Sequence, residues 1–371
     1  MKFTTTRKAL LNAVAQAAAV TDAKASLTVL ANVKLEANAG EDVIAITGTD
    51  TYTTVTALVT ATIDKPGSCL VDAKTLRDIC GSLPEHGGDV HAEIELTKLT
   101  LRCGKARRTI AALDAEDYPM LAKEPECPVT LASEALLRAI STVEHAMSMD
   151  ETRPMLAGVM LVCADGKVAA KTTDGHRLTQ TEGACEAGAF ECLLPSRGVA
   201  AMKRALAEHD GITKIGADAS HATMRCGDIT TTTMRLAGAV FPPSEKVIPR
   251  NHPHVARVSR TMLLDAVRGA RVTAKQEGKE QSDAMAITFA PGEIRVEAQG
   301  ARGESSDVVD CDYAGKVVSI GFQPKYLIDA LSCMAADEVA IAFCGPLDPI
   351  LVTPALTNET QAVVMPQRMT R

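Results

Sequence analysis

The chain has 371 residues, too many for a single hydrophobic core of usual size, so the sequence predicts two or three domains. It is 46% hydrophobic and 23% charged, and it contains no apolar run of the roughly 18 residues that a membrane helix requires. The net charge of −7 is spread as −2, −2 and −3 over residues 1–125, 126–250 and 251–371, which excludes a basic module. Any contact with nucleic acid must therefore come from locally placed cations.

The eleven cysteines are odd in number and form no CxxC pair. This pattern favours buried thiols in a reducing cytoplasm over a disulfide scaffold. Cys185 and Cys192 flank a predicted loop, and a disulfide between them is a minor alternative. We therefore expect a cytoplasmic protein.

Two helical patterns each occur three times. The first resembles a secretory signal at its N-terminal copy, but Asn12 and Gln16 interrupt that apolar run, so a structural helix is predicted there. Its Leu-Leu pairs are separated by 126 and 127 residues. The second pattern follows a short extended run and a helix-start signal. The predicted helices are residues 7–14, 133–140 and 260–267 for the first pattern, and 74–80, 197–206 and 324–331 for the second.

The segments between these helices alternate with a period of two, which predicts antiparallel strands with one buried face. Clear examples are residues 43–47, 93–97, 99–102 and 293–297. The fold class is therefore α+β, with three repeated units of about 120 residues each. Proline-rich links at 118–128 and 241–253 separate the units. The predicted domains are residues 1–125, 126–250 and 251–371.

Familiar catalytic motifs are absent from the sequence: it has no P-loop, GxGxxG, HExxH or GxSxG pattern. Asp174 and His176, two residues apart on one strand, form a candidate acid–base pair near Cys163, but no placed nucleophile accompanies them. His252 and His254 are candidate metal ligands, although a solvated proline-rich link is the simpler interpretation. We expect no enzyme activity, no metal and no cofactor.

Residues 172–178 are the most informative stretch. Residues 168–173 are predicted to form a strand, and Asp174-Gly175 is a strong turn dipeptide. An extended chain then resumes at His176. An ordinary hairpin explains this stretch by itself, but a weaker copy, Thr49-Asp50, lies 124 residues earlier.

These residues, within the threefold repeat, carry a family resemblance. The string Thr173-Asp174-Gly175-His176-Arg177-Leu178 is followed by the tail Val363-Val364-Met365-Pro366-Gln367-Arg368. Met1-Lys2-Phe3, Asp78-Ile79-Cys80, Phe241-Pro242, Val247-Ile248-Pro249 and Ile320-Gly321-Phe322 extend the match along the chain. The sequence resembles the bacterial DNA polymerase III beta subunit family, the DNA sliding clamps.

The resemblance implies a processivity factor in which two chains of three clamp domains close head to tail into a ring. Helices would line the hole and antiparallel sheets would form the outside. The ring would encircle double-stranded DNA without reading its sequence. Its other partners would be the DNA polymerase III alpha subunit, the clamp loader and other proteins with clamp-binding motifs. The DNA-facing cations would be Lys24, Arg7, Lys8, Lys74, Arg77, Arg138, Arg197, Lys203, Arg204, Arg260 and Lys325.

Two further surfaces follow from the resemblance. A hydrophobic pocket for partner peptides, completed by the C-terminal tail, would contain Leu156, Thr173, Gly175, His176, Arg177, Leu178, Pro242, Val247, Val363, Met365, Pro366 and Arg368, with Arg177 and Arg368 at the rim. The dimer interface would pair Lys105, Arg107 and Arg108 with Val272, Glu304 and Asp307. The sequence departs from the family pattern at Lys24, Pro154-Met155, Lys246, Gln367 and the tail residues 369–371.

Two other protein classes stay open at this point. The first is an acidic multidomain binding protein that does not engage DNA, which would be an open monomer. The second is an enzyme that uses Asp174 and His176, which would show turnover that depends on Asp174.

Overall fold

The computed structural model describes residues 1–150, 152–186, 188–236, 238–249, 252–275, 284–301 and 303–368. The tail residues 369–371 lie outside the described part. The chain forms two compact units, of which unit 1 contains residues 1–137, 163–166 and 185–237. Unit 2 contains residues 138–162, 167–184 and 238–371, so the middle third of the chain contributes to both units.

Unit 1 is built on a continuous antiparallel sheet with the order β10-β15-β16-β17-β4-β3-β2-β6-β9-β8-β7-β1-β5. Its strands are β1 (Lys2–Thr6), β2 (Asn32–Ala37), β3 (Val43–Thr49), β4 (Thr53–Thr60), β5 (Thr62–Lys65), β6 (Gly67–Asp72), β7 (Asp89–Glu95), β8 (Lys98–Cys103), β9 (Ala106–Leu113), β10 (Val129–Ala132), β15 (Ile212–Ala217), β16 (His221–Cys226) and β17 (Ile229–Met234). Strand β14 (Phe190–Pro195) leads into the helix α4 (Ser196–Ala207).

The helices of the first third begin at side-chain caps that follow a strand. The hydroxyl of Thr6 caps α1 (Arg7–Ala18), and the carboxylate of Asp72 caps α2 (Ala73–Gly81). Such caps satisfy backbone N–H groups that have no partner within the helix. Both helices pack together against the sheet, and Val14 of α1 is fully buried there. The N-terminal segment is therefore a structural helix, as predicted.

In unit 2 the antiparallel strand order is β11-β12-β13-β25-β24-β23-β18-β21-β20-β19-β22. These strands are β11 (Gly158–Ala164), β12 (Lys167–Thr173), β13 (Arg177–Ala184), β18 (His254–Ser259), β19 (Met285–Ala290), β20 (Glu293–Gly300), β21 (Gly303–Asp312), β22 (Val318–Phe322), β23 (Glu338–Phe343), β24 (Ile350–Pro354) and β25 (Thr360–Val364). The remaining helices are α3 (Ser133–Val143), α5 (Arg260–Thr273) and α6 (Pro324–Ser332), with 3-10 turns η1 (Thr28–Ala31), η2 (Glu144–Ala146), η3 (Pro154–Leu156) and η4 (Ser244–Lys246).

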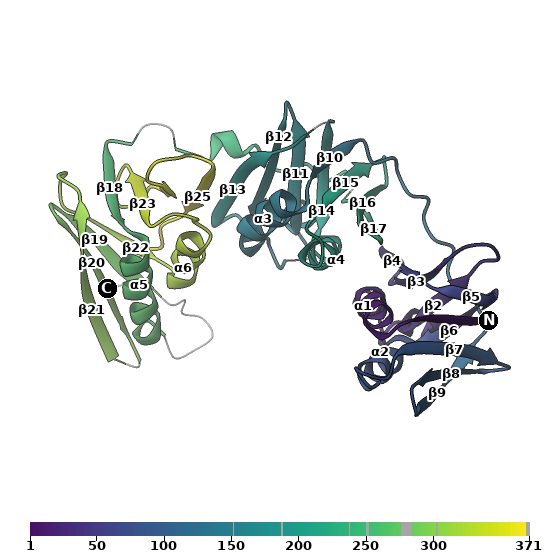
Figure 1. The fold of residues 1–371 in the computed structure, drawn as a ribbon. Coiled ribbons are helices and arrows are strands. Elements are labelled where there is room, and N and C mark those ends of the chain that lie inside the picture. Colours follow the sequence, from purple (N-terminus) through teal and green to yellow (C-terminus); the bar gives the residue numbers. More distant parts are fainter. Residues whose placement is uncertain are drawn as a thin grey trace. The chain divides into compact units, whose positions relative to one another are not determined.

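Each unit encloses a core of aliphatic and phenylalanine side chains. In unit 2, α5 and α6 lie side by side over the sheet (Figure 1) and close a core around Phe289, Phe322 and Phe343. In unit 1, Phe3 and Leu10 belong to the corresponding core between α1, α2 and the sheet. Branched aliphatic side chains fill both cores, as the scarcity of aromatic residues requires.

The predicted α+β plan is confirmed, because all six predicted helical segments lie inside helices α1 to α6. One strand prediction was too long. The alternation of residues 93–97 continues past the end of β7, but Leu96 has a φ of 53° and is 99% exposed. Leu96 and Thr97 form a two-residue turn between Glu95 and its partner Lys98. Hydrophobic alternation does not reveal such a turn.

None of the helices in the described part of the chain is long and apolar enough to span a membrane. All eleven cysteines are free thiols, including Cys185 and Cys192. Burial raises the pKa of Cys163 to about 12, with Cys185 as a further cause. A thiol with this pKa is not a nucleophile at neutral pH.

Candidate functional site

The turn between β12 and β13 is held by the side chains that the sequence analysis singled out. The hydroxyl of Thr173 donates to the carbonyl oxygen of Arg177 at 2.7 Å and accepts from the N–H of Gly175 at 3.1 Å. A carboxylate oxygen of Asp174 accepts from the N–H groups of His176 (2.9 Å) and Arg177 (3.0 Å). Gly175 has a φ of 91°, which favours glycine at this position. Residues 173–177 therefore form a turn whose polar groups are hydrogen-bonded to one another.

Strand β13 pairs with β25 from the last third of the chain. Arg177 lies opposite Val364 and Leu178 opposite Val363. The ladder continues past the strand end, because the N–H of Met365 donates to the carbonyl oxygen of His176 at 2.9 Å. Antiparallel register thus brings together two motifs that are far apart in sequence.

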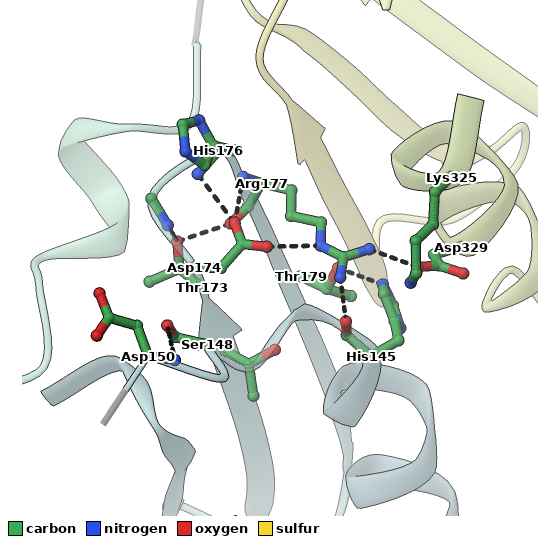
Figure 2. A network of polar contacts seen from close by, with 12 residues as sticks. His145, Ser148, Asp150, Thr173, Asp174, His176, Arg177, Thr179, Lys325 and Asp329 are labelled. Atoms are coloured by element: carbon green, nitrogen blue, oxygen red, sulfur yellow. Dashed lines mark hydrogen bonds and ion pairs between the residues drawn. The ribbon is translucent and has the colours of Figure 1, made fainter. Parts of the chain in front are cut away.

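Arg177 is the centre of a buried polar network (Figure 2). Its Nε donates to Asp174 at 3.0 Å, one Nη contacts Asp329 of α6, and the other donates to the carbonyl oxygen of His145. The guanidinium carbon lies 4.6 Å from the centre of the Tyr326 ring. The side chain of Arg177 is only 7% exposed. The expectation that Arg177 lies at a pocket rim is wrong, because internal acceptors already occupy its guanidinium.

The network shifts the pKa of two of its members. Burial, reinforced by the positive charge of Arg177, lowers the pKa of His145 to about 4, so its ring is neutral at pH 7. Burial tends to raise the pKa of Asp329, but hydrogen bonds from Lys325 and Arg177 outweigh it and lower that pKa. The carboxylate of Asp329 is therefore charged. The ion pair between Arg177 and the charged Asp329 holds the turn against α6.

The acid–base interpretation of Asp174 and His176 is not supported. The Asp174 carboxylate is occupied by Arg177 and by backbone N–H groups, and the His176 ring stacks on Tyr326 with centroids 6.3 Å apart. The geometry therefore gives His176 a packing role. The described residues contain no group of three or more His, Cys, Asp or Glu side chains that could hold a metal ion. His252 instead contacts the Pro249 carbonyl oxygen.

An open cavity of about 400 Å³ lies beside this turn. Its lining residues are His176, Gln323, Tyr326, Met365, Pro366, Gln367 and Arg368. Four of them, namely His176, Met365, Pro366 and Arg368, were among the expected pocket residues. Gln323 and Tyr326 were not among the expected pocket residues. They lie at the start of a helix that the sequence predicts, but no sequence pattern indicated that this helix lies close to the C-terminal tail.

The other expected pocket residues separate into a covered and an exposed set. Leu178 and Val363 are 2% and 1% exposed, and Leu156 and Thr173 are also buried. Val247 is 42% exposed, Gly175 is also exposed, and Pro242 is half-buried; Met365 in the cavity is 38% exposed. Of the buried residues, Leu178 and Val363 lie opposite each other on β13 and β25, and we call this pair the floor of the expected pocket.

The expected DNA-facing cations lie on helices, apart from Lys24 in the loop after α1. Lys8, Lys74, Arg77, Arg138, Arg197, Arg204 and Lys325 are exposed, and Lys203 is half-buried. Arg7 and Arg260 are also half-buried and donate to the carbonyl oxygens of Gly81 and Ala336. Within unit 1, Arg197 and Arg204 line a cavity of about 330 Å³ with Asp22 and Asp50.

The expected interface residues lie on or beside β9 and β21, except for Val272 on α5. Lys105, Arg107 and Arg108 are at the turn from β8 into β9, and Arg107 pairs with Arg102 of β8. Glu304 and Asp307 are on β21, where they face β20 in the register. Within the described ranges, the other backbone edge of β9 is unpaired over residues 106–111, and that of β21 is unpaired over 303–310. Val272 of α5 is 61% exposed.

Comparison with known proteins identifies the class. The family models of the DNA polymerase III beta subunit match as an N-terminal domain at residues 1–122, a central domain at 130–243 and a C-terminal domain at 245–368. The beta sliding clamps of Pseudomonas putida and Pseudomonas aeruginosa are 27% and 28% identical over the whole of both chains.

Solved structures agree with these matches. The crystal structure of the DNA polymerase III subunit beta of Pseudomonas aeruginosa has a TM-score of 0.89 at 28% identity, covering 99% of this chain and 100% of that one. The clamp of the same organism bound to griselimycin has a TM-score of 0.91 at 28% identity, with both chains fully covered.

The chain belongs to the DNA polymerase III beta subunit family. It consists of three clamp domains and acts as a sliding-clamp processivity ring in DNA replication, not as an enzyme. DNA, polymerase and further partner proteins are the classes of molecule that this family binds. The resemblance in the sequence is therefore confirmed.

Proposed function

We propose that the surface formed by the β12–β13 turn, the end of β25 and connector residues 238–249 binds short apolar segments of partner proteins. The observation that carries this proposal is the 400 Å³ cavity shared by His176, Tyr326 and Met365, which come from three separate parts of the chain. Met365 is unbranched, polarisable and 38% exposed, which suits a groove that accepts different side chains. Arg368, also in the cavity, supplies a cation for polar groups of the peptide.

Substitution of Met365 tests this proposal. Met365→Ala removes a partly exposed anchor, so affinity for a partner polymerase's clamp-binding peptide falls by about 1–3 kcal/mol while the melting temperature stays close to the parent's. Met262→Ala on α5, at 56% exposure, is the matched control and leaves peptide affinity unchanged. If Met365→Ala lowers only the melting temperature, these residues seal the sheet junction and the assignment fails.

Leu178 serves a different measurement because it is almost fully covered. Leu178→Ala leaves a cavity at a position that is only 2% exposed, and we expect it to lower the free energy of unfolding by about 2–5 kcal/mol. A change in peptide affinity in this variant would combine lost contacts with altered packing. Met365 is therefore the better residue for testing affinity.

We also propose that the ring is a homodimer in which the β9 edge of one chain pairs with the β21 edge of the other. The free backbone edges support this pairing, as do the opposite charges of Lys105, Arg107 and Arg108 against Glu304 and Asp307. Each exposed ion pair contributes only about 0–1 kcal/mol, so strand pairing and apolar packing near Val272 must supply most of the affinity. A monomeric mass by light scattering at micromolar concentration would refute the model.

Retention on DNA is proposed to be topological. The helix cations Lys8, Lys74, Arg77, Arg138, Arg197, Lys203, Arg204 and Lys325, together with Lys24 and the half-buried Arg7 and Arg260, give loose phosphate contacts. Binding to short linear duplex is expected to be weak and steeply dependent on salt. A ring loaded onto circular DNA stays bound in high salt and is released when the circle is cut. Retention that survives linearisation would contradict encirclement.

The DNA polymerase III alpha subunit, the clamp loader and other proteins with clamp-binding motifs are the proposed partners, and the cytoplasm is the proposed location. The proposed domain limits are residues 1–125, 126–250 and 251–371. Limited proteolysis tests these limits, because exposed links between domains are cut first. Cleavage concentrated at residues 118–128 and 241–253 is expected, and early cleavage inside a domain would argue against the limits.

A further inference from the structure

A second cavity of about 400 Å³ lies on unit 2, and the expected pocket does not include it. It is formed by β13, β24, β25 and the connector. Its lining residues are Gln180, Glu245, Ile248, Pro249, His252, Leu351, Asn358 and Gln361.

The strand register places this cavity beside the floor of the proposed peptide site. Gln180 lies opposite Gln361, two residues along from the pair Leu178 and Val363. Residues two apart on a strand share a face and are about 6.6 Å apart. Leu351, which lines the cavity, lies directly opposite Val363 on β24. An extended peptide over the Leu178–Val363 floor therefore reaches the cavity within two residues.

Two buried polar atoms of this cavity's residues have no hydrogen-bond partner: Oε1 of Gln180 and Nδ1 of His252. The amide Nε2 of Gln180 donates to Gln361 at 2.7 Å, so its oxygen is the atom left over. The Nε2 of His252 is 2.8 Å from the carbonyl oxygen of Pro249, which can only accept. Nε2 therefore carries a proton, and in this tautomer of the imidazole Nδ1 is an acceptor.

Both unsatisfied atoms are acceptors, and an unpaired buried acceptor costs free energy until a donor reaches it. Among the described lining residues, the carboxylate of Glu245 is charged, and Lys171 of β12 contacts it at 3.2 Å. Among the lining residues that the structure describes, none is Lys or Arg. Ile248, Pro249 and Leu351 supply apolar walls. The cavity thus combines acceptors and an anion with an apolar wall that suits an aliphatic stem.

We propose that this cavity receives an arginine side chain of the bound partner segment. This arginine lies two residues along the peptide from the residue that packs on the Leu178–Val363 floor. Its guanidinium offers five N–H donors in a planar fork and no acceptor, which matches the two orphaned acceptors and Glu245. Solvent does not reach either orphaned atom in the present arrangement, so side chains lining the cavity change rotamer as the arginine enters. This inference rests on the peptide site proposed above.

The experiment uses the full-length protein and the clamp-binding peptide of a partner polymerase, extended by two residues at either end. The outer residue is arginine, norleucine or glutamate. On the parent protein, the arginine peptide with the correct polarity binds about tenfold more tightly than its norleucine counterpart, and the glutamate peptide binds more weakly. Gln180→Leu combined with His252→Phe removes the arginine advantage and leaves the affinity of the unextended peptide unchanged.

The outcomes separate this inference from the proposed function. If the unextended peptide does not bind the parent protein, the peptide site itself is wrong. If it binds but arginine gives no advantage, or if the advantage persists in the double variant, the cavity holds only solvent and the inference is overturned. Met365→Ala weakens all the peptides by the same factor and serves as the control for anchoring. Melting temperatures confirm that each variant is folded.

Discussion

Two sheet junctions of this chain have the same backbone and different side-chain chemistry. Within unit 1, β4 pairs with β17, and within unit 2, β13 pairs with β25. The turn before β4 repeats the turn before β13 bond for bond. Thr49 donates to the Thr53 carbonyl oxygen at 3.1 Å, and Asp50 accepts from Tyr52 and Thr53 at 3.0 and 2.6 Å. Even the left-handed residue is repeated, as Thr51 with a φ of 76°.

The side chains differ at the last residue of each turn and at the first two residues of each following strand. Thr53 occupies the place of Arg177, Tyr52 that of His176, and Thr54 that of Leu178. The unit 1 junction is held by paired hydroxyls, such as Thr53 with Thr233 at 3.0 Å. The unit 2 junction also has a hydroxyl pair, Thr181 with Thr360 at 2.9 Å, but next to its turn lie the apolar pair Leu178 and Val363 and a buried guanidinium. The same backbone turn thus carries the proposed peptide-binding surface in unit 2 and a polar junction with a hydroxyl pair beside the turn in unit 1.

The largest expected effect distinguishes the two electrostatic arrangements. Arg177→Ala leaves the carboxylates of Asp174 and Asp329, 15% and 21% exposed, without their cation. We expect the free energy of unfolding of unit 2 to fall by about 3–5 kcal/mol, as measured by hydrogen exchange of the β13 amides. At the unit 1 junction, Arg197 is 68% exposed and contacts Asp50, which is 6% exposed, so Arg197→Ala leaves one buried carboxylate instead of two and should cost less, about 1–3 kcal/mol. Equal costs would contradict the comparison.

The second prediction concerns pH. His145 has a folded pKa of about 4 against an ordinary value of 6.5. Between these values the unfolded chain binds a proton that the folded chain excludes, so the free energy of unfolding falls as pH falls from 6.5 to 4, by about 3 kcal/mol. The lowered pKa of Asp329 extends the loss below its ordinary value of 3.8. Denaturant titrations at several pH values give the free energy of unfolding as a function of pH. For His145→Gln this free energy should fall less steeply between pH 6.5 and 4 than for the parent. If it falls equally steeply, His145 does not cause the pH dependence.

The third prediction tests the hydroxyl pair beside the turn of unit 1. Thr233→Val leaves the buried hydroxyl of Thr53 without its partner, at a cost of about 1–3 kcal/mol in the free energy of unfolding. Adding Thr53→Val removes both polar groups and should restore most of that loss. A double-mutant cycle by urea denaturation measures the coupling. Additive losses would mean that the two hydroxyls do not depend on each other.

The smallest effect comes from exchanging the left-handed residues of the two turns. Thr51→Gly relieves a β-branched residue at positive φ and should stabilise unit 1 by up to about 1 kcal/mol. Gly175→Ala should destabilise unit 2 by about 1 kcal/mol through backbone strain alone, because the added Cβ meets its nearest atom, on Arg153, at 3.8 Å. Thermal melting of both variants measures the effects. Shifts of the same sign would show that the turns are not equivalent.

The sequence by itself determined the repeat, the six helices and most strands, because hydrophobic periodicity and capping residues are local signals. It also determined the turn at Asp174-Gly175, since the bonds of Thr173 and Asp174 lie within four residues. The family followed from motifs spread along the chain.

Only the tertiary structure decided which of these residues are buried and what they contact. Arg177 is followed by an apolar residue and would be exposed on an isolated hairpin, but Asp329 and the carbonyl oxygen of His145 draw it inward. Leu178 is set beside Val363, and Gln180 beside Gln361, by the pairing of β13 with β25. These contacts join residues up to 181 positions apart, and no local pattern encodes the register that creates them.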